Sequence, residues 1–144
     1  MFKKNYLIIL TLCLTTLSGS LVFAEICPDV VGDWDATVNW VIYDPNIEPP
    51  DDPFFYTQFT LIFHILQQDG CLFYGYREVP NNPQAQAPIT GVISQGMSIT
   101  WNASGTLYNG ILGGYNPSRH IFTKIKYTVL NSYQNAGKGI ATRK

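Results

Sequence analysis

The chain has 144 residues, of which 46% are hydrophobic and 13% charged, and its nine basic and ten acidic residues give a formal net charge of −1 at pH 7. The Lys and Arg residues form no cluster of the kind that binds nucleic-acid phosphates, so nucleic acid is excluded as an expected partner. The length suits one domain with a single core and leaves no room for a second.

The first 24 residues have the features of a secretory signal peptide. Lys3 and Lys4 precede an apolar run from Tyr6 to about Leu17, and small residues precede a cleavage site after Ala24. A retained transmembrane helix is the alternative, but the apolar run is shorter than the roughly 20 residues that cross a bilayer. We therefore expect a secreted or periplasmic protein with one domain, residues 25–144, and a formal net charge of −3.

Two cysteines remain after cleavage, because Cys13 is lost with the signal peptide. Cys27 could in principle carry a lipid, but Glu25 and Ile26 before it do not fit a lipobox, so we expect no stable membrane anchor. In an oxidising compartment Cys27 and Cys71 are the only possible pair, and we expect one disulfide. A reactive or metal-binding thiol is the alternative, although no His or Cys lies at ligand spacing from either residue.

Strict alternation marks the first expected strand, from Asp33 to Ile42. Its apolar residues share one parity and its polar residues the other, and a period of two indicates a strand with one buried face. A second strand is expected around Phe59 to Ile65, and the Asp69-Gly70 step after it favours a tight hairpin.

Six further strands are expected around residues 71–79, 89–93, 97–102, 106–112, 120–130 and 138–143, with all nine prolines outside the strands. Residues 43–53 then form an acidic, proline-rich loop at the barrel mouth, and residues 80–88 form a longer neutral loop. Short turns make successive strands antiparallel, and closure removes their exposed edges. The prediction is an all-β protein, an eight-stranded antiparallel up-and-down β-barrel, with a β-sandwich as the alternative.

A family resemblance begins at Gly32-Asp33-Trp34, which resembles the Gly-x-Trp start of calycin barrels, the group of lipocalins and avidins. Residues 69–76 resemble an avidin hairpin, and residues 89–110 resemble its middle strands. The resemblance implies that Gly32, Trp34 and Arg143 close one barrel end, with the cationic Arg143 packed across the Trp34 ring. The polar residues that hold biotin in avidins are missing after Trp34, so biotin is not an expected ligand.

Four aromatic residues on inward parities are the candidate ligand-binding residues: Trp40, Phe59, Phe63 and Trp101. An eight-stranded barrel can hold one small ligand or be filled by its own side chains. These aromatics could therefore line a pocket for an apolar or mixed ligand, or simply fill the core. The sequence does not separate the two.

No catalytic residues, cofactor or metal site are predicted. Asp33 and Asp35 share one strand face, and His64 and His120 are isolated, so solvent-facing or structural roles explain them. Four carboxylates in residues 43–53 could hold Ca²⁺, but they follow no calcium-loop signature. Asn102-Ala103-Ser104 matches a glycosylation sequon.

Three hypotheses of function remain open at this stage. The first is an exported, non-enzymatic binding protein that takes a small apolar or mixed ligand in the barrel. The second is a solid barrel that contacts another protein through its loops, notably residues 43–53, as an inhibitor or envelope component. The third is an isomerase or hydrolase that uses Asp35, His64 or Glu78.

Overall fold

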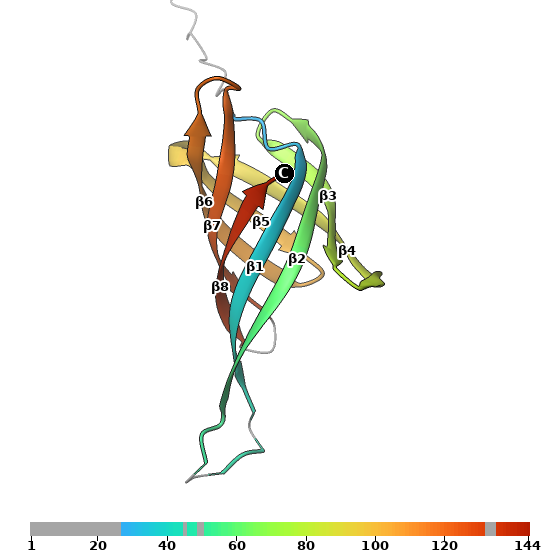
Figure 1. Cartoon of the computed structure of the whole chain (residues 1–144), viewed down its shortest axis with the longest axis vertical. Coiled ribbons are helices and arrows are strands. Elements are labelled where there is room, and N and C mark those ends of the chain that lie inside the picture. Colours follow the sequence, from blue (N-terminus) through green and yellow to red (C-terminus); the bar gives the residue numbers. More distant parts are fainter. Residues whose placement is uncertain (1–26, 45, 49–50, 132–134) are drawn as a thin grey trace, which may run out of the picture.

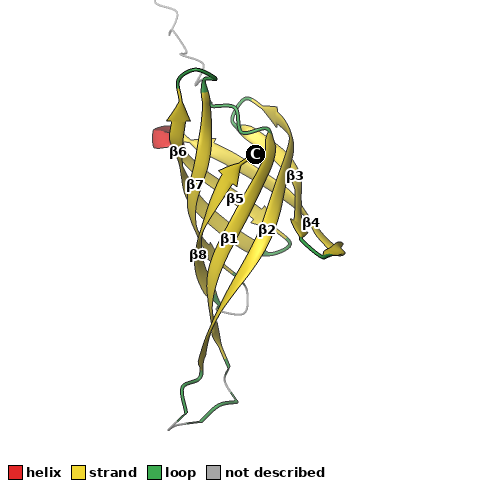
Figure 2. Ribbon diagram, viewed as in Figure 1, coloured by secondary structure: helices red, strands yellow, loops and turns green. Residues whose placement is uncertain are grey.

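The chain forms a closed, eight-stranded antiparallel β-barrel (Figures 1 and 2). A computed structural model describes residues 27–44, 46–48, 51–131 and 135–144, so the predicted signal peptide lies outside the described residues. The strands are β1 (Gly32–Tyr43), β2 (Phe54–Asp69), β3 (Leu72–Val79), β4 (Asn82–Ser94), β5 (Ser98–Ala103), β6 (Thr106–Asn116), β7 (Ile121–Leu130) and β8 (Ala136–Arg143), with a short 3₁₀ helix, η1 (Gln95–Met97), between β4 and β5.

Each strand pairs with its neighbour in the chain, and β8 returns to pair with β1. The predicted all-β barrel is therefore confirmed, and the sandwich alternative is wrong. None of the helical structure in the described part of the chain is long and apolar enough to cross a membrane.

Strand alternation places one apolar face inside the barrel. The even residues Trp34, Ala36 and Val38 of β1 and the odd residues Leu61, Phe63 and Ile65 of β2 are buried. Every described residue classed as buried is hydrophobic, so the interior is a continuous apolar core. Burial of this face is the main favourable contribution to folding.

Two strands start earlier than predicted. β2 begins at Phe54 rather than near Phe59, and β4 begins at Asn82 rather than near Ile89. The prediction that residues 80–88 form a loop, and that every proline lies outside a strand, is therefore wrong for Pro83 and Pro88. The first half of β4 pairs with β3 alone, because pairing with β5 starts at Ile89, and edge segments tolerate proline.

One end of the barrel is closed by contacts around Trp34. The Trp34 indole is fully buried and donates a hydrogen bond from Nε1 to the Val30 carbonyl oxygen at 2.9 Å. The Arg143 guanidinium lies over the Trp34 ring, 5.6 Å from its centroid, which is the arrangement that the calycin resemblance implies. Arg143 also binds the Asp29 carboxylate at 3.1 Å, and Gly32 lies directly beside the guanidinium.

The segment before β1 is fastened by the Cys27–Cys71 disulfide, whose Cα atoms are 5.2 Å apart. Cys71 lies in the turn between β2 and β3, and the Gln68 amide donates a further hydrogen bond to the Pro28 carbonyl oxygen at 3.0 Å. The predicted pairing is confirmed. It ties the chain across the barrel end that holds Trp34.

Candidate functional site

The barrel interior is filled by aromatic side chains. Trp101 and Tyr108 stack with centroids 4.9 Å apart, and Phe63 packs edge-on against Trp101 at 5.4 Å. Tyr127 completes the cluster, 5.5 Å from Trp101. The space left beside this cluster is about 10 Å³, no larger than a single water molecule needs.

The four predicted ligand-binding aromatics do not surround a common cavity. Phe63 and Trp101 are core residues with exposed fractions of 2% and 3%. Trp40 is half-buried at the end of the core, and Phe59 is 44% exposed. The interior around Phe63 and Trp101 is therefore filled by side chains, and ligand binding by the four aromatic residues stays a prediction.

The two interior tyrosines have perturbed acidities. Burial raises the pKa of Tyr108, and a hydrogen bond of 3.2 Å from Arg77 partly offsets that rise. Burial and the neighbouring Tyr108 raise the pKa of Tyr127 well above its usual range. Both phenols are therefore held in the neutral form by the folded barrel.

We expect this burial to make the protein sensitive to alkali. A phenol whose pKa is higher in the folded state stabilises that state fully below its unfolded pKa of 10.0, and the contribution is lost as pH rises above that value. The free energy of unfolding should therefore fall above about pH 10, and Tyr127 should ionise only on unfolding. An alkaline titration of tyrosinate absorbance beside urea unfolding checks this, with Tyr127→Phe as the control that flattens the pH dependence. Complete tyrosine ionisation by the folded protein would contradict it.

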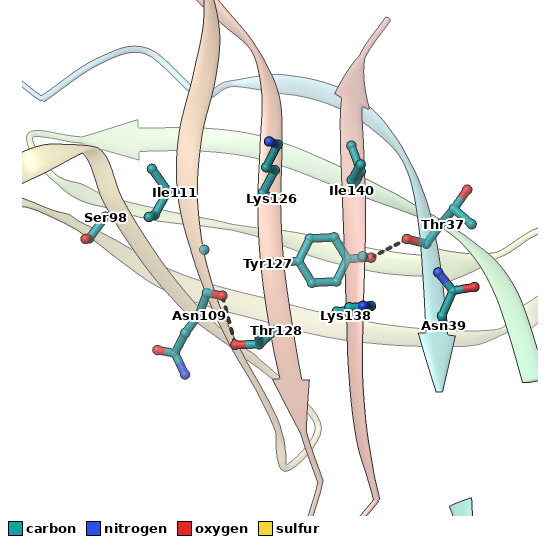
Figure 3. Close-up of a pocket in the computed structure, with 12 residues that line it drawn as sticks. Thr37, Asn39, Ser98, Asn109, Ile111, Lys126, Tyr127, Thr128, Lys138 and Ile140 are labelled. Atoms are coloured by element: carbon teal, nitrogen blue, oxygen red, sulfur yellow. Dashed lines mark hydrogen bonds between the residues drawn. The ribbon is translucent and has the colours of Figure 1, made fainter. Parts of the chain in front are cut away.

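A groove of about 700 Å³ lies on the outside of the barrel, over β1, β6, β7 and β8 (Figure 3). Its rim is formed by outward-facing residues of these strands: Asn39, Asn109, Ile111, Lys126, Lys138 and Ile140. The Tyr127 ring lies beneath β8 and donates a hydrogen bond from its hydroxyl to the Thr37 carbonyl oxygen at 3.4 Å. Gly139 permits this position, because a Cβ there would lie 2.5 Å from the Tyr127 ring.

A second hollow of about 650 Å³ continues the groove toward β2. It shares Asn39 and Lys138 with the first and extends to Tyr56 and Gln58. The residues that line the two hollows include two lysines and no carboxylate. We call this continuous depression the outer groove; it is an open, basic surface with apolar sides.

Four exposed aromatic residues lie close together on a projecting part of β1 and β2. Pairing of β1 with β8 stops at Val41, and the two remaining strands continue as a ribbon away from the barrel (Figure 1). We define the aromatic hairpin as residues 41–44 and 51–56. Its exposed side chains include Tyr43 (44%), Phe54 (47%), Phe55 (47%) and Tyr56 (78%).

Both faces of the aromatic hairpin are apolar. Ile42 pairs with Phe55 on the face that continues the barrel interior, while Tyr43 pairs with Phe54 on the other face, their ring centroids 5.5 Å apart. The alternation that buries one face inside the barrel therefore persists where there is no barrel to cover it. The alternation in the sequence predicts Phe59 inside the barrel and no strand over residues 54–57, so it does not reveal this surface.

Of the residues named in the enzymatic hypothesis, the structure brings His64 and Glu78 together but not Asp35. His64 donates a hydrogen bond from Nδ1 to the Asp33 carboxylate at 2.8 Å and lies 3.4 Å from the Glu78 carboxylate, with its ring stacked on Tyr76 at 4.4 Å. Asp35 instead pairs with Lys144 at 3.0 Å. The cluster joins the outer faces of β1, β2 and β3. Within the described residues, no group of three or more His, Cys, Asp or Glu side chains is arranged to hold a metal ion.

Neither a protein-family model nor a curated protein matches the chain. Among solved structures, a redesigned β-barrel is similar with a TM-score of 0.46 and 12% sequence identity, over 84% of this chain and 94% of that one. The likeness carries no information on function, and membership of the calycin group stays a prediction.

Proposed function

We propose that this chain is an exported, non-enzymatic binding protein that acts from the outside of its barrel, by contacting a protein surface through the aromatic hairpin. The exposure of Tyr43, Phe54, Phe55 and Tyr56 on one projecting ribbon carries the proposal. Contiguous apolar surface on a folded protein commonly marks an interaction site, and Tyr is among the residues enriched in energetic hot spots.

The filled interior supports an external site. A drug-sized ligand occupies a pocket of roughly 300–1,000 Å³, and the space inside the core is about 10 Å³. A ligand could enter only if the cluster around Phe63 and Trp101 repacked, which would expose large apolar side chains. The second hypothesis from the sequence is therefore the better supported one.

The shape of the aromatic hairpin suits insertion into a partner. Its two strands extend directly from paired strands of the barrel, so the ribbon is positioned by the barrel wall rather than by a free loop. Aromatic side chains bury a large area with few rotatable bonds, which lowers the entropy lost on binding. Asp44, Glu48, Asp51 and Asp52 lie in the connection between Tyr43 and Phe54, so a complementary partner has an apolar groove with basic residues at one end.

The compartment is part of the proposal. The Cys27–Cys71 disulfide is typical of a non-reducing environment. Together with the signal peptide expected over residues 1–24, it supports action outside the cytoplasm, in the periplasm or the medium.

The test is a binding measurement with matched surface variants. The exported protein should retain a protein from its own compartment, and titration of that partner after purification should give a dissociation constant. Phe55→Ser/Tyr56→Ser should weaken binding at least about 30-fold, because a buried aromatic anchor contributes on the order of 2 kcal/mol.

The control variant is Leu72→Ser/Leu130→Ser, which removes two similarly exposed apolar side chains (62% and 54%) from the barrel wall. It should bind within about twofold of the unaltered protein. Failure to find a partner, or equal weakening by both pairs of substitutions, would refute the proposed role of the aromatic hairpin.

A further inference from the structure

We infer that the surface recognised by the aromatic hairpin is the outer groove of a second copy of this chain, so that two copies form a dimer. The inference rests on the proposed function and names its partner. Three observations support it: the distribution of unpaired charges, the chemistry of the outer groove, and the way in which hairpin and groove adjoin.

Unpaired charges of opposite sign are separated on the described surface. Asp29, Asp33, Asp35 and Glu78 each have a basic or imidazole partner within 4.0 Å. Of the other carboxylates among the described residues, Asp69 lies at the end of β2, and the remaining four lie next to or between the hairpin strands: Asp44, Glu48, Asp51 and Asp52.

The lysines without ion pairs lie together elsewhere, whereas Arg77 and Arg119, which also have no ion pair among the described residues, lie outside the outer groove. Arg143 and Lys144 are paired with Asp29 and Asp35. Across the described part of the chain, the lysines that have no such partner are all on the outer faces of β7 and β8: Lys124, Lys126 and Lys138. Lys126 and Lys138 line the outer groove. One molecule therefore presents an acidic projection and a basic depression, and these attract each other between copies.

The outer groove also matches the apolar part of the hairpin. Ile111 and Ile140 on its rim are 61% and 49% exposed and give the groove apolar surface. Gly110 and Gly139 also line the groove, and a Cβ at either position would meet Tyr127 beneath it. Aromatic side chains such as Phe55 and Tyr56 can lie against this surface and cover both isoleucines.

The two surfaces are adjacent on one molecule, because the second hollow of the outer groove includes Tyr56 of the hairpin together with Lys138. Two copies placed side by side in opposite directions, related by a two-fold axis, can therefore place each hairpin on the groove of the other copy. Such an isologous arrangement uses both complementary contacts and closes at two subunits.

Sedimentation velocity on the purified, exported protein from about 1 to 500 µM tests the inference. We expect a monomer–dimer equilibrium with a dissociation constant in the micromolar range, as for modest interfaces with a few anchors. Lys126→Glu/Lys138→Glu and, separately, Asp51→Lys/Asp52→Lys should each weaken dimerisation at least about 10-fold through like-charge repulsion. Arg119→Glu, outside the groove, should leave it unchanged.

The decisive variant combines both reversals. It has the same formal net charge as the unaltered protein and exchanges the signs at positions 51 and 52 of the hairpin and at positions 126 and 138 of the groove, so it should dimerise more tightly than either reversal alone. Circular dichroism and thermal unfolding should show that each variant is folded.

Three results would overturn the inference: a monomer at every concentration, a dimer that is indifferent to both reversals, or no recovery in the combined variant. A monomer that binds a different purified protein through Phe55 and Tyr56 would overturn it while leaving the proposed function intact. A dimer insensitive to Phe55→Ser/Tyr56→Ser would count against both.

Discussion

Gly75→Ala should leave most of the protein unfolded, with a loss of more than about 4 kcal/mol from the free energy of unfolding. Gly75 lies in β3 opposite Ile65 of β2, next to a shift of register in that pairing. A Cβ at position 75 would overlap the carbonyl oxygen of His64 and lie 2.8 Å from its carbonyl carbon. Both are backbone atoms of the paired strand, so relief requires separation of β2 from β3. Urea unfolding followed by circular dichroism measures the loss.

Gly113→Ala is the matched control for this prediction. Gly113 also lies in a strand, β6, but a Cβ there would meet no atom within 4 Å. The substitution should change the free energy of unfolding by less than about 1 kcal/mol. A similar loss in both variants would mean that the close approach of β2 and β3 at Gly75 is not the cause.

Removal of the disulfide should produce the other large loss. Cys27 and Cys71 are separated by 44 positions, and closing a loop of that length stabilises a protein by about 4 kcal/mol in the chain-entropy description. Cys27→Ala/Cys71→Ala should therefore lower the urea midpoint strongly, and reduction of the unaltered protein should do the same. A reductant should have no further effect on the double variant.

If the disulfide-free protein kept its stability, the loop closed by Cys27 and Cys71 would have to be restrained in the unfolded chain already. The hydrogen bonds of Gln68 to the segment 28–30 would then be sufficient to hold that segment. The urea midpoints of the unaltered protein with and without reductant show whether the disulfide or these hydrogen bonds hold the segment.

The barrel itself was predictable from alternation. In β1, the residues Trp34, Ala36 and Val38 share a parity that only a strand with one buried face explains, and these residues are buried. Short turns then required antiparallel neighbours. The presence of eight such segments made closure the simplest way to remove two exposed edges.

The errors at β2 and β4 have identifiable causes. Phe54, Phe55 and Tyr56 are three consecutive aromatic residues, so apolar and polar residues do not alternate there. This is the part of β2 that extends beyond the barrel, where neither face of the ribbon is covered. Pro83 and Pro88 act as strand breakers in a sequence, but the half of β4 that contains them has a neighbour on one side only. The first part of β2 is a strand because it pairs with β1, and the first part of β4 is a strand because it pairs with β3. Such tertiary pairing cannot be predicted from the local sequence.

The outer groove had no signal in the sequence. Lys126 and Lys138 are separated along the chain and meet only because β7 and β8 pair with Thr128 opposite Lys138. Register decides which outward residues lie side by side. The same holds for the contact of His64 with Asp33, which depends on the register of β1 and β2.

Closure by β1 and β8 also has a kinetic consequence. The strand pairs that close the barrel join Trp34 to Arg143 and Val41 to Ala136. β1 therefore cannot complete its pairing until the last residues of the chain are in place. Contacts of such long sequence separation slow folding. A polypeptide still being synthesised therefore lacks the β1–β8 pairing until its last strand is available.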